Sequence, residues 1–324
     1  MNNNGGNDEH YLKSRLAESF TYRRFSTEPA HAHERSFTDV TIDFFNRSIT
    51  GATIKVSSNF LMLEHERVKF NLVNLYLRAN GTRCVTLSQK QFALNMEFAT
   101  ESDATGFKAA CDNFVVRENV WDTYFSMREL DKGAFSTVRL ARKHSSYSEL
   151  FAVKEMRKDG VDEKAFRYLE MELYALRNVR NECALKLFEI YEDATSIYLI
   201  TEYLNNGTLE KKIKNRENDE ETARKVLNTV LSVIIELNKY NIVHRDIKPA
   251  NIMFTLNKAN QETCKLIDFG LCADLTDQSA TSLLRDKSGT VCYLAPELIG
   301  WDLINQMYNE QVDVFSLGMI LYEM

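Results

Sequence analysis

The chain has 324 residues, 44% of them hydrophobic, and this length suffices for about two domains. The formal net charge is −6, but the part that ends at Val120 is neutral, with 14 basic and 14 acidic side chains, so the rest of the chain carries the whole excess. The sequence has no basic stripe of the kind that binds nucleic acid, and no apolar run reaches the roughly 18 residues of a membrane span. We therefore expect neither a nucleic-acid-binding protein nor a membrane-spanning one.

The N-terminal segment, residues 1–36, is rich in Asn, Ser, His and charge and is predicted to lack a fixed fold. Its first ten residues, MNNNGGNDEH, do not have the basic and apolar pattern of a secretory signal. The six cysteines of the chain are scattered without a CxxC pair, which is typical of free thiols in a reducing compartment. We therefore expect a cytoplasmic protein.

Residues 37–118 have the composition of several strands followed by one helix. The stretches ATIKVSSNFLMLE, VKFNLVNLYLR and TRCVTLSQKQFALNMEFA are strand-like. In the next stretch, SDATGFKAACDNFVV, Ser102 or Asp103 is expected to cap a helix. Its apolar residues recur at helical spacing: Ala104, Phe107, Ala110, Cys111, Phe114 and Val115. Strands closed by one C-terminal helix resemble a pleckstrin-homology-like (PH-like) domain, which implies a small β-barrel or sandwich.

That resemblance leaves the role of this segment open. Lys55, Arg67 and Lys69 could form a phosphoinositide site, but we favour ordinary solvated strand residues, because the segment has no excess of positive charge. Lipid binding is therefore possible but not favoured. Two other roles are a protein adaptor and an intramolecular cover of the remaining chain.

From Trp121 the sequence changes character. The stretches YFSMREL, STVRLARK and LFAVKEM are predicted strands, and a helical stretch follows through Leu176. Two more strands are expected around Leu185–Tyr191 and Ile197–Glu202, after which the pattern is mostly helical. The pattern predicts five strands followed by helices.

Five motifs in this part carry a family resemblance. FAVK ends at Lys154, VHRDIKPANIMF begins at Val243, LIDFG begins at Leu266, APE begins at Ala295, and DVFSLGMILYEM ends the chain. In order and spacing, residues 124–324 resemble the eukaryotic serine/threonine protein kinases of the calcium/calmodulin-dependent type. The resemblance implies an α+β bilobal fold, with an antiparallel five-stranded N-lobe and a helical C-lobe, and transfer of the ATP γ-phosphoryl group to protein hydroxyls with Mg²⁺.

The resemblance also implies catalytic and metal-binding residues. Asp246 would orient the substrate hydroxyl and accept its proton, and Lys248 would stabilise the transferring phosphoryl group. Asn251 and Asp268 offer oxygen atoms, which suit Mg²⁺ together with phosphates and water. Lys248 and Thr290, in HRDIKPAN and SGTVCYLAPE, resemble the serine/threonine kinases rather than the tyrosine kinases.

The nucleotide would be held by residues of both lobes. Lys154 would bind the α- and β-phosphates and pair with a carboxylate, for which Glu172 is preferred over Glu170 from the register of EMELYALRNV. The adenine pocket and its rim would be formed by Leu130, Val138, Ala152, Thr201, Met253 and the backbone of Glu202 and Leu204.

The loop LDKGAFSTV departs from the glycine-rich pattern of the family. Gly133 keeps the second glycine, Asp131 replaces the first and Ser136 replaces the third. We expect the charge of Asp131 to weaken ATP binding by about 1 kcal/mol without abolishing it.

Regulation and the chain's end leave alternatives. Arg245 is expected to meet a negative group of the activation loop. Asp286 is one candidate for that group, and the equal alternative is that Asp286 is an ordinary solvated aspartate.

Met324 falls inside a long C-lobe helix, so the C-lobe is expected to be incomplete and to leave apolar residues uncovered. These are Phe315, Leu317, Ile320 and Leu321. The alternatives to an active kinase are a nucleotide-binding pseudokinase or scaffold and an inactive fragment.

Overall fold

The structure is a computed structural model that divides into two compact units. Unit 1 contains residues 1–160 and 187–201, and unit 2 contains residues 161–186 and 202–324. The residues that the structure describes are 34–44, 47–57, 60–63, 68–72, 75–89, 92–112, 114–133, 136–159, 163–257, 259–276, 290–299 and 309–324. Most of the predicted N-terminal tail, Arg67 and Asp286 lie outside this part, and so does the side chain of Lys69.

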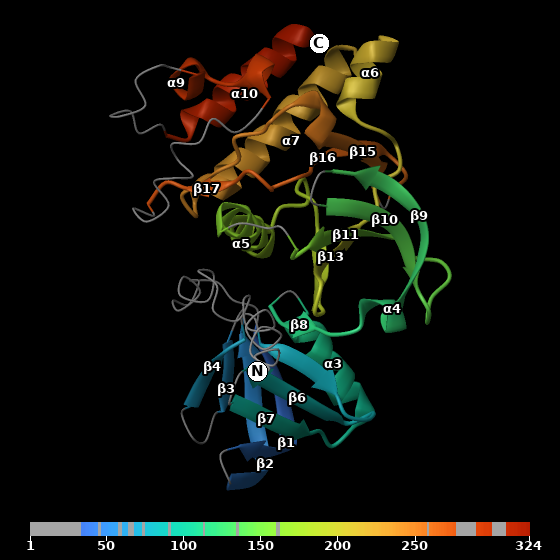
Figure 1. The fold of residues 1–324 in the computed structure, drawn as a ribbon, viewed down its shortest axis with the longest axis vertical. Coiled ribbons are helices and arrows are strands. Elements are labelled where there is room, and N and C mark those ends of the chain that lie inside the picture. Colours follow the sequence, from blue (N-terminus) through green and yellow to red (C-terminus); the bar gives the residue numbers. More distant parts are fainter. Residues whose placement is uncertain are drawn as a thin grey trace, which may run out of the picture. The chain divides into compact units, whose positions relative to one another are not determined.

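Unit 1 is organised around one continuous sheet, whose described strands follow the order β4-β3-β2-β1-β7-β6-β5-β8-β12-β13-β11-β10-β9. Figure 1 labels most of these strands. Its elements are β1 (Glu34–Phe44), β2 (Arg47–Ser57), β3 (Phe60–Leu63), β4 (Val68–Asn71), β5 (Tyr76–Ala79), β6 (Cys84–Gln89), β7 (Phe92–Glu97), α3 (Glu101–Cys111), β8 (Val116–Arg117), α4 (Val120–Thr123), β9 (Tyr124–Lys132), β10 (Ser136–Lys143), β11 (Phe151–Arg157), β12 (Leu187–Glu192) and β13 (Ser196–Glu202).

The elements β1 to β7 and α3 form what we call the N-terminal β domain, residues 34–111. Alternate residues of β2, namely Ala52, Ile54 and Val56, are buried, as expected for a strand with one face on a core. Helix α3 packs on this core: the ring of Phe107 lies 5.7 Å from that of Phe37 in β1, edge to face. Helix α3 therefore shares an apolar core with β1 and β2.

The helix begins earlier than the sequence suggested. Its N-cap is Thr100, whose hydroxyl accepts a hydrogen bond from the backbone N–H of Asp103 at 3.1 Å. The prediction of Ser102 or Asp103 as the cap was therefore wrong. The helix ends at Cys111, so Phe114 and Val115 lie beyond it, yet both are buried.

Strands β9 to β13 form the second part of the sheet. A core of aromatic and aliphatic side chains supports them, including Tyr124, Phe151 and Tyr191. The ring of Tyr124 meets those of Phe151 and Tyr191 edge to face at 5.3 and 6.0 Å. The predicted five-strand lobe has one addition: β8 pairs with β12 in a parallel arrangement.

Unit 2 is mostly helical, as Figure 1 shows. Its elements are α5 (Glu163–Asn178), α6 (Leu209–Asn215), α7 (Glu220–Asn238), β14 (Ile242–Val243), η1 (Pro249–Asn251), β15 (Ile252–Leu256), β16 (Glu262–Leu266), β17 (Ala273–Asp274), η3 (Val291–Tyr293), α9 (Pro296–Ile299) and α10 (Gln311–Glu323). Asp219 caps α7 by accepting a hydrogen bond from the N–H of Thr222 at 2.8 Å. Helices α7 and α10 pack together. The predicted α+β class is confirmed.

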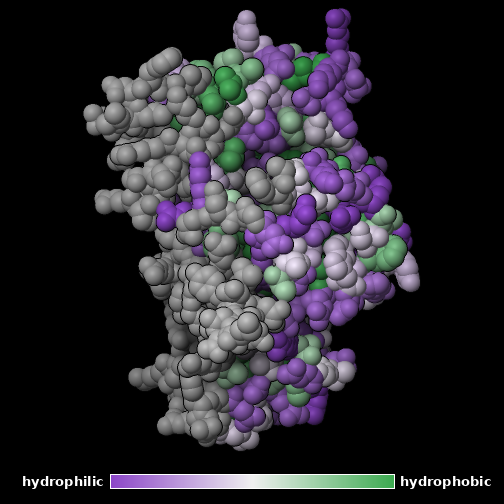
Figure 2. Space-filling model, in the orientation of Figure 1, coloured by the Kyte–Doolittle hydropathy of each residue, from purple (hydrophilic) through white to green (hydrophobic). Residues whose placement is uncertain are grey.

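The expected exposed apolar face of α10 is only partly present. Leu317 and Ile320 are 2% and 0% exposed, so the prediction that they lie uncovered was wrong. Phe315 and its neighbour Val314 are exposed, at 39% and 49%. On the face shown in Figure 2, the described surface is mainly hydrophilic with small separate apolar patches. None of the described helices is long and apolar enough to cross a membrane.

Candidate active site

The centre of the site is the loop between β14 and β15, which carries VHRDIKPAN. A buried carboxylate fixes its backbone: Asp313 of α10 accepts hydrogen bonds from the N–H groups of His244 and Arg245 at 2.7 and 2.8 Å. This anchor holds Arg245 in the left-handed region, with φ of 66°, a conformation that costs free energy for a non-glycine residue. The Arg245 side chain also donates from Nε to the carbonyl of Leu271 at 2.8 Å.

Asp246 is 7% exposed and has donors on both carboxylate oxygens. Lys248 Nζ and Asn251 Nδ2 donate to Oδ2 at 2.7 and 2.9 Å. The hydroxyl of Thr290 donates to Oδ1 at 3.2 Å. A second bond from Asn251 Nδ2, to the carbonyl of Asp246 at 2.9 Å, closes the loop on itself. The carboxylate is therefore held in one orientation.

His244 lies behind Asp246 with its ring against Phe269, at a centroid separation of 5.1 Å. Burial lowers the pKa of His244, and the nearby charges of Asp313, Asp246 and Asp268 only partly oppose this. The ring is accordingly neutral at pH 7 and acts as packing for the loop.

Asp268 follows β16 and is exposed, unlike Asp246. Its φ is 59°, and its Oδ1 accepts a bond from the N–H of Gly270 at 3.3 Å. The N–H of Ile267 donates to the carbonyl of Asn251 at 2.8 Å, and β15 pairs antiparallel with β16. These bonds place the LIDFG segment beside the VHRDIKPAN segment within unit 2.

Three more predicted nucleotide residues belong to unit 2. Glu202 is held by Lys265 Nζ, at 2.8 Å from Oε1, and its N–H donates to the carbonyl of Lys186. Leu204 is buried, and Met253 is half-buried on β15, where it forms a bridge with Thr208.

The other residues predicted to bind the nucleotide lie in unit 1, on neighbouring strands. Val138 of β10 is directly opposite Lys154 of β11, and Leu140 is opposite Ala152. Thr201 is 6% exposed and its hydroxyl donates to the carbonyl of Ala152 at 3.4 Å. Val138, Lys154, Ala152 and Thr201 therefore gather on adjacent strands.

The loop that starts at Leu130 joins the antiparallel strands β9 and β10. The N–H of Gly133 donates to the carbonyl of Ser136 at 2.8 Å, and a Cβ at Gly133 would lie 3.3 Å from Ser136 Oγ, so little room exists for a side chain. Asp131 lies on β9, opposite Val138, and is not among the described residues with positive φ. An aspartate therefore replaces the first glycine without backbone strain.

Two predicted groupings span both units and stay predictions. Glu172 and Glu170 are both buried on α5 in unit 2, whereas Lys154 lies in unit 1, so the choice of partner for Lys154 is not tested. The resemblance to the kinase family also implies a stacked apolar column that would lock the active form, and this column is likewise divided between the units. Its members are Leu176, Leu187, His244 and Phe269, all of them buried.

Comparison with known protein families identifies the family of this chain. Residues 124–324 match the family described as the protein kinase domain. The chain belongs to the protein kinase family. The kinase match begins at the first residue of β9.

The chain is similar in sequence to several named protein kinases. It is 33% identical over 205 residues to a probable myosin light chain kinase of Dictyostelium discoideum, covering 63% of this chain and 40% of that protein. It is 33% identical over 214 residues to calcium-dependent protein kinase 4 of Plasmodium berghei, covering 64% of this chain and 39% of that protein. A second probable myosin light chain kinase of D. discoideum is 31% identical over 245 residues, 75% of this chain and 68% of the relative. The chain thus spans about two fifths of the length of the first two relatives.

One functional residue of the kinase was missed in the sequence. No role was predicted from the sequence for Asp313 at the start of the last motif, although its carboxylate anchors the loop that carries VHRDIKPAN. The available signal was an acidic residue at the start of an otherwise apolar helix, QVDVFSLGMILYE, where burial demands hydrogen-bond partners.

Proposed function

We propose that this kinase transfers the γ-phosphoryl group of ATP to serine and threonine hydroxyls of proteins, with Mg²⁺. The observation that carries the proposal is the setting of Asp246, a buried carboxylate oriented by Lys248, Asn251 and Thr290. Phosphoryl transfer depends on positioning and charge neutralisation, and a fixed carboxylate of this kind suits the orientation of a hydroxyl group.

The other residues have supporting roles in this proposal. Lys248 lies beside the proposed base and would neutralise charge on the transferring group. Lys154, paired with Glu172, would hold the α- and β-phosphates, and Gly133 would let the loop backbone approach them. Leu130, Val138, Ala152, Thr201, Glu202, Leu204 and Met253 would surround the adenine.

The side chains present fit Mg²⁺. Asn251 commits its amide nitrogen to Asp246, so its amide oxygen is the atom suited to a metal, and the carboxylate of Asp268 is exposed. Among the described residues there is no cluster of three or more His, Cys, Asp or Glu side chains that could hold a metal. The ion would therefore share its coordination with phosphate oxygens and water and would neutralise phosphate charge.

The test is phosphotransfer from radiolabelled ATP to degenerate peptides that carry Ser, Thr or Tyr as the single acceptor. We expect label on Ser and Thr peptides, dependence on added Mg²⁺ and loss with a chelator. Labelling of Tyr peptides alone would contradict the proposed specificity. Nucleotide binding without transfer to any peptide would favour the pseudokinase alternative.

We infer a PH-like architecture for the N-terminal β domain, supported by its seven described strands followed by one helix. Lipid binding is not the favoured role, because the segment up to Val120 has no net charge. Co-sedimentation of the full chain with phosphoinositide vesicles should show no more binding than with neutral vesicles.

We also propose a cytoplasmic location, supported by six cysteines without disulfides. Imaging of the tagged chain in its native cell would test this, and a purely vesicular or extracellular signal would contradict it.

A further inference from the structure

The connection between the N-terminal β domain and the kinase strands is short, and its middle part is buried. Residues 112–123 join the end of α3 to the start of β9, and they include no Gly or Pro. Val115, Val116 and Val120 are each 2% exposed or less. Domain boundaries usually fall in exposed, flexible linkers, whereas this connection buries its valines, although Asn119 and Asp122 are exposed.

Strand β8 lies within this connection and is bonded on both sides. Val116 and Arg117 pair with Ile190 and Tyr191 of β12 in parallel register. On its other side Val116 pairs with Tyr76 of β5. Strand β12 is the outer strand of the kinase part of the sheet, and an open edge of this kind is a site for unwanted pairing. Here β8 covers that edge and joins it to the N-terminal β domain.

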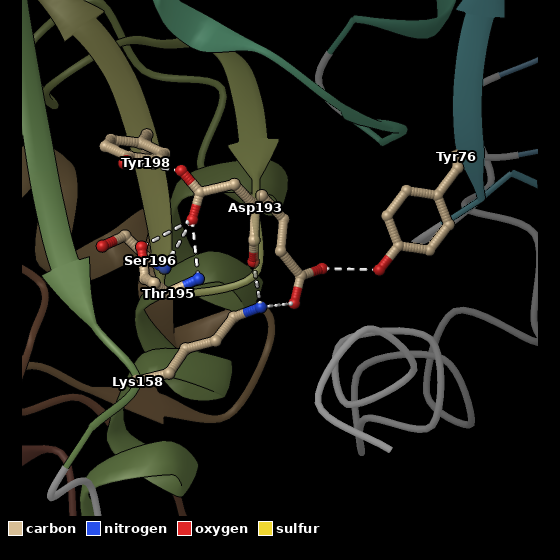
Figure 3. Close-up of polar contacts among 7 residues, drawn as sticks. Tyr76, Lys158, Asp193, Thr195, Ser196 and Tyr198 are labelled. Carbon is tan, nitrogen blue, oxygen red and sulfur yellow. Dashed lines mark hydrogen bonds and ion pairs between the residues drawn. The ribbon is translucent and has the colours of Figure 1, made fainter. Parts of the chain in front are cut away.

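A polar contact reinforces the backbone pairing (Figure 3). The hydroxyl of Tyr76, in the N-terminal β domain, donates to Oε2 of Glu192 at 2.7 Å. The other carboxylate oxygen of Glu192 lies 2.7 Å from Nζ of Lys158, and the side chains of Lys158 and Glu192 are only 5% and 1% exposed. Glu192 thus binds a residue of each part.

The turn that presents Glu192 is held rigidly. Asp193 Oδ1 accepts bonds from the N–H groups of Thr195 and Ser196, both at 2.8 Å. Its Oδ2 accepts the hydroxyl of Tyr198 at 2.8 Å. Figure 3 shows these side chains gathered around Asp193, with Tyr76 approaching from the other strand. The backbone that follows Glu192 is therefore fixed by several hydrogen bonds.

A second buried group lies at the same junction. Glu189 accepts the hydroxyls of Tyr124 and Tyr191 at 3.0 and 2.8 Å and forms an ion pair with Lys143 at 2.8 Å. Burial alone would raise the pKa of Glu189, but the charges of Arg117 and Lys143 and these hydrogen bonds outweigh it and lower the pKa. Arg117 belongs to β8, so the connection also contributes charge to the kinase strand.

These contacts make it unfavourable for the N-terminal β domain to separate from the kinase strands. A cover that lifts from the kinase would expose Val116, open the β12 edge and leave Glu192 without its tyrosine. Loss of one partner from a buried charge is unfavourable, because the remaining group keeps its desolvation cost. The contacts favour a permanent attachment over a reversible cover.

We propose that the N-terminal β domain is a fixed structural partner of the kinase sheet, docked on edge strand β12 through β8 and through the Tyr76–Glu192–Lys158 contact. This docking does not depend on whether the chain transfers phosphoryl groups. In this proposal Tyr76 is a positioning residue, because it acts on the kinase strands through Glu192.

Hydrogen exchange on the full chain, read by mass spectrometry, tests the docking. Peptides that cover residues 114–118 and 187–192 should exchange as slowly as the peptide of β13, because all three would open only with the sheet. In Tyr76→Phe the two junction peptides should exchange roughly 10- to 100-fold faster, the range for a lost hydrogen bond to a charged acceptor.

The matched control is Tyr147→Phe, since Tyr147 is a tyrosine of unit 1 with 80% exposure. It should leave the junction peptides unchanged. Fast exchange of residues 114–118 in the parent chain would overturn the proposal. Equal exchange in Tyr76→Phe and Tyr147→Phe would overturn the role of Tyr76. The measurement needs no catalytic activity, so its failure is distinct from failure of the kinase assignment.

A second readout separates a fixed partner from an inhibitory cover. With the phosphotransfer assay above, Tyr76→Phe should be no faster than the parent chain. A rate increase of several fold would show that the contact holds an inhibitory cover in place, and would contradict the fixed docking.

Discussion

At the scale of single residues, two aspartates of the kinase differ in ways that match their proposed tasks. Asp246 is buried and bound by three side chains, whereas Asp268 is exposed and bound through the backbone N–H of Gly270. A carboxylate that orients a hydroxyl must not rotate, whereas one that meets a hydrated ion must be open to it. Identical side chains thus acquire separate roles from their surroundings.

Asp131 offers a test of the one-glycine loop. Asp131→Asn keeps an oxygen that can accept the N–H of Lys132, now bound at 2.9 Å, but removes the negative charge. ATP·Mg²⁺ should bind about three- to five-fold more tightly, because the repulsion of the phosphates is relieved. The measurement is the rise in melting temperature as nucleotide is added.

Glu149→Gln, at an exposed position of the loop between β10 and β11, is the matched charge control and should bind ATP like the parent chain. An unchanged or weaker affinity in Asp131→Asn would show that the charge of Asp131 does not oppose ATP.

At the scale of elements, the sequence predicted strands and helices best where a family motif and the spacing of apolar residues indicated the same element. The LFAVKEM stretch became β11, and the helical stretch through Leu176 became α5. The spacing of apolar residues was enough to predict these two elements, because each of them buries one face. The cap of α3 was misplaced, since Thr100, Ser102 and Asp103 are all residues that cap helices and only the backbone chooses among them.

Strand β8 could not be predicted from the sequence, for a different reason. Its two residues, Val116 and Arg117, are too few to show a period, and Val116 fits equally well at the end of the helical stretch before it. Its pairing with β5 and β12 joins residues that are far apart in the chain, which no local pattern reports. The same holds for Asp313, whose partners lie 68 and 69 residues away.

The cap of α3 provides a prediction at this scale. Thr100→Ala removes the acceptor for the N–H of Asp103 and should destabilise unit 1 by about 1 kcal/mol, the usual value of an N-cap. Denaturant unfolding followed by far-UV circular dichroism measures it. Thr100→Ser, which retains the hydroxyl, should behave like the parent chain; an equal loss in both variants would show that the hydroxyl is not the stabilising group.

At the scale of the whole molecule, unit 1 contains several buried tyrosines at its junction. Burial, with neighbouring glutamates, raises the pKa of Tyr76, Tyr124 and Tyr191 above the ordinary value. A group whose pKa is higher in the folded state gives stability that is complete below its unfolded pKa and is lost as the pH rises. For tyrosine this loss begins near pH 10.

Unit 1 should therefore lose stability steeply between about pH 10 and pH 11, with each such tyrosine adding up to about 1.4 kcal/mol per pH unit. Denaturant unfolding at a series of pH values measures the slope. Tyr124→Phe should reduce it, whereas Tyr147→Phe, at an exposed site, should not. A slope that is unchanged in Tyr124→Phe would contradict this account.

The central claim is that the kinase uses Asp246 to transfer phosphoryl groups, and the phosphotransfer rate of Asp246→Asn tests it most directly. Asparagine keeps the shape and hydrogen-bonding capacity but cannot take a proton, so the rate should fall by about 10²- to 10⁴-fold. ATP should still bind, and Asp43→Asn, an exposed change on β1, should keep full activity. Undiminished transfer by a folded Asp246→Asn, or none by the parent chain with ATP and Mg²⁺, would contradict the account.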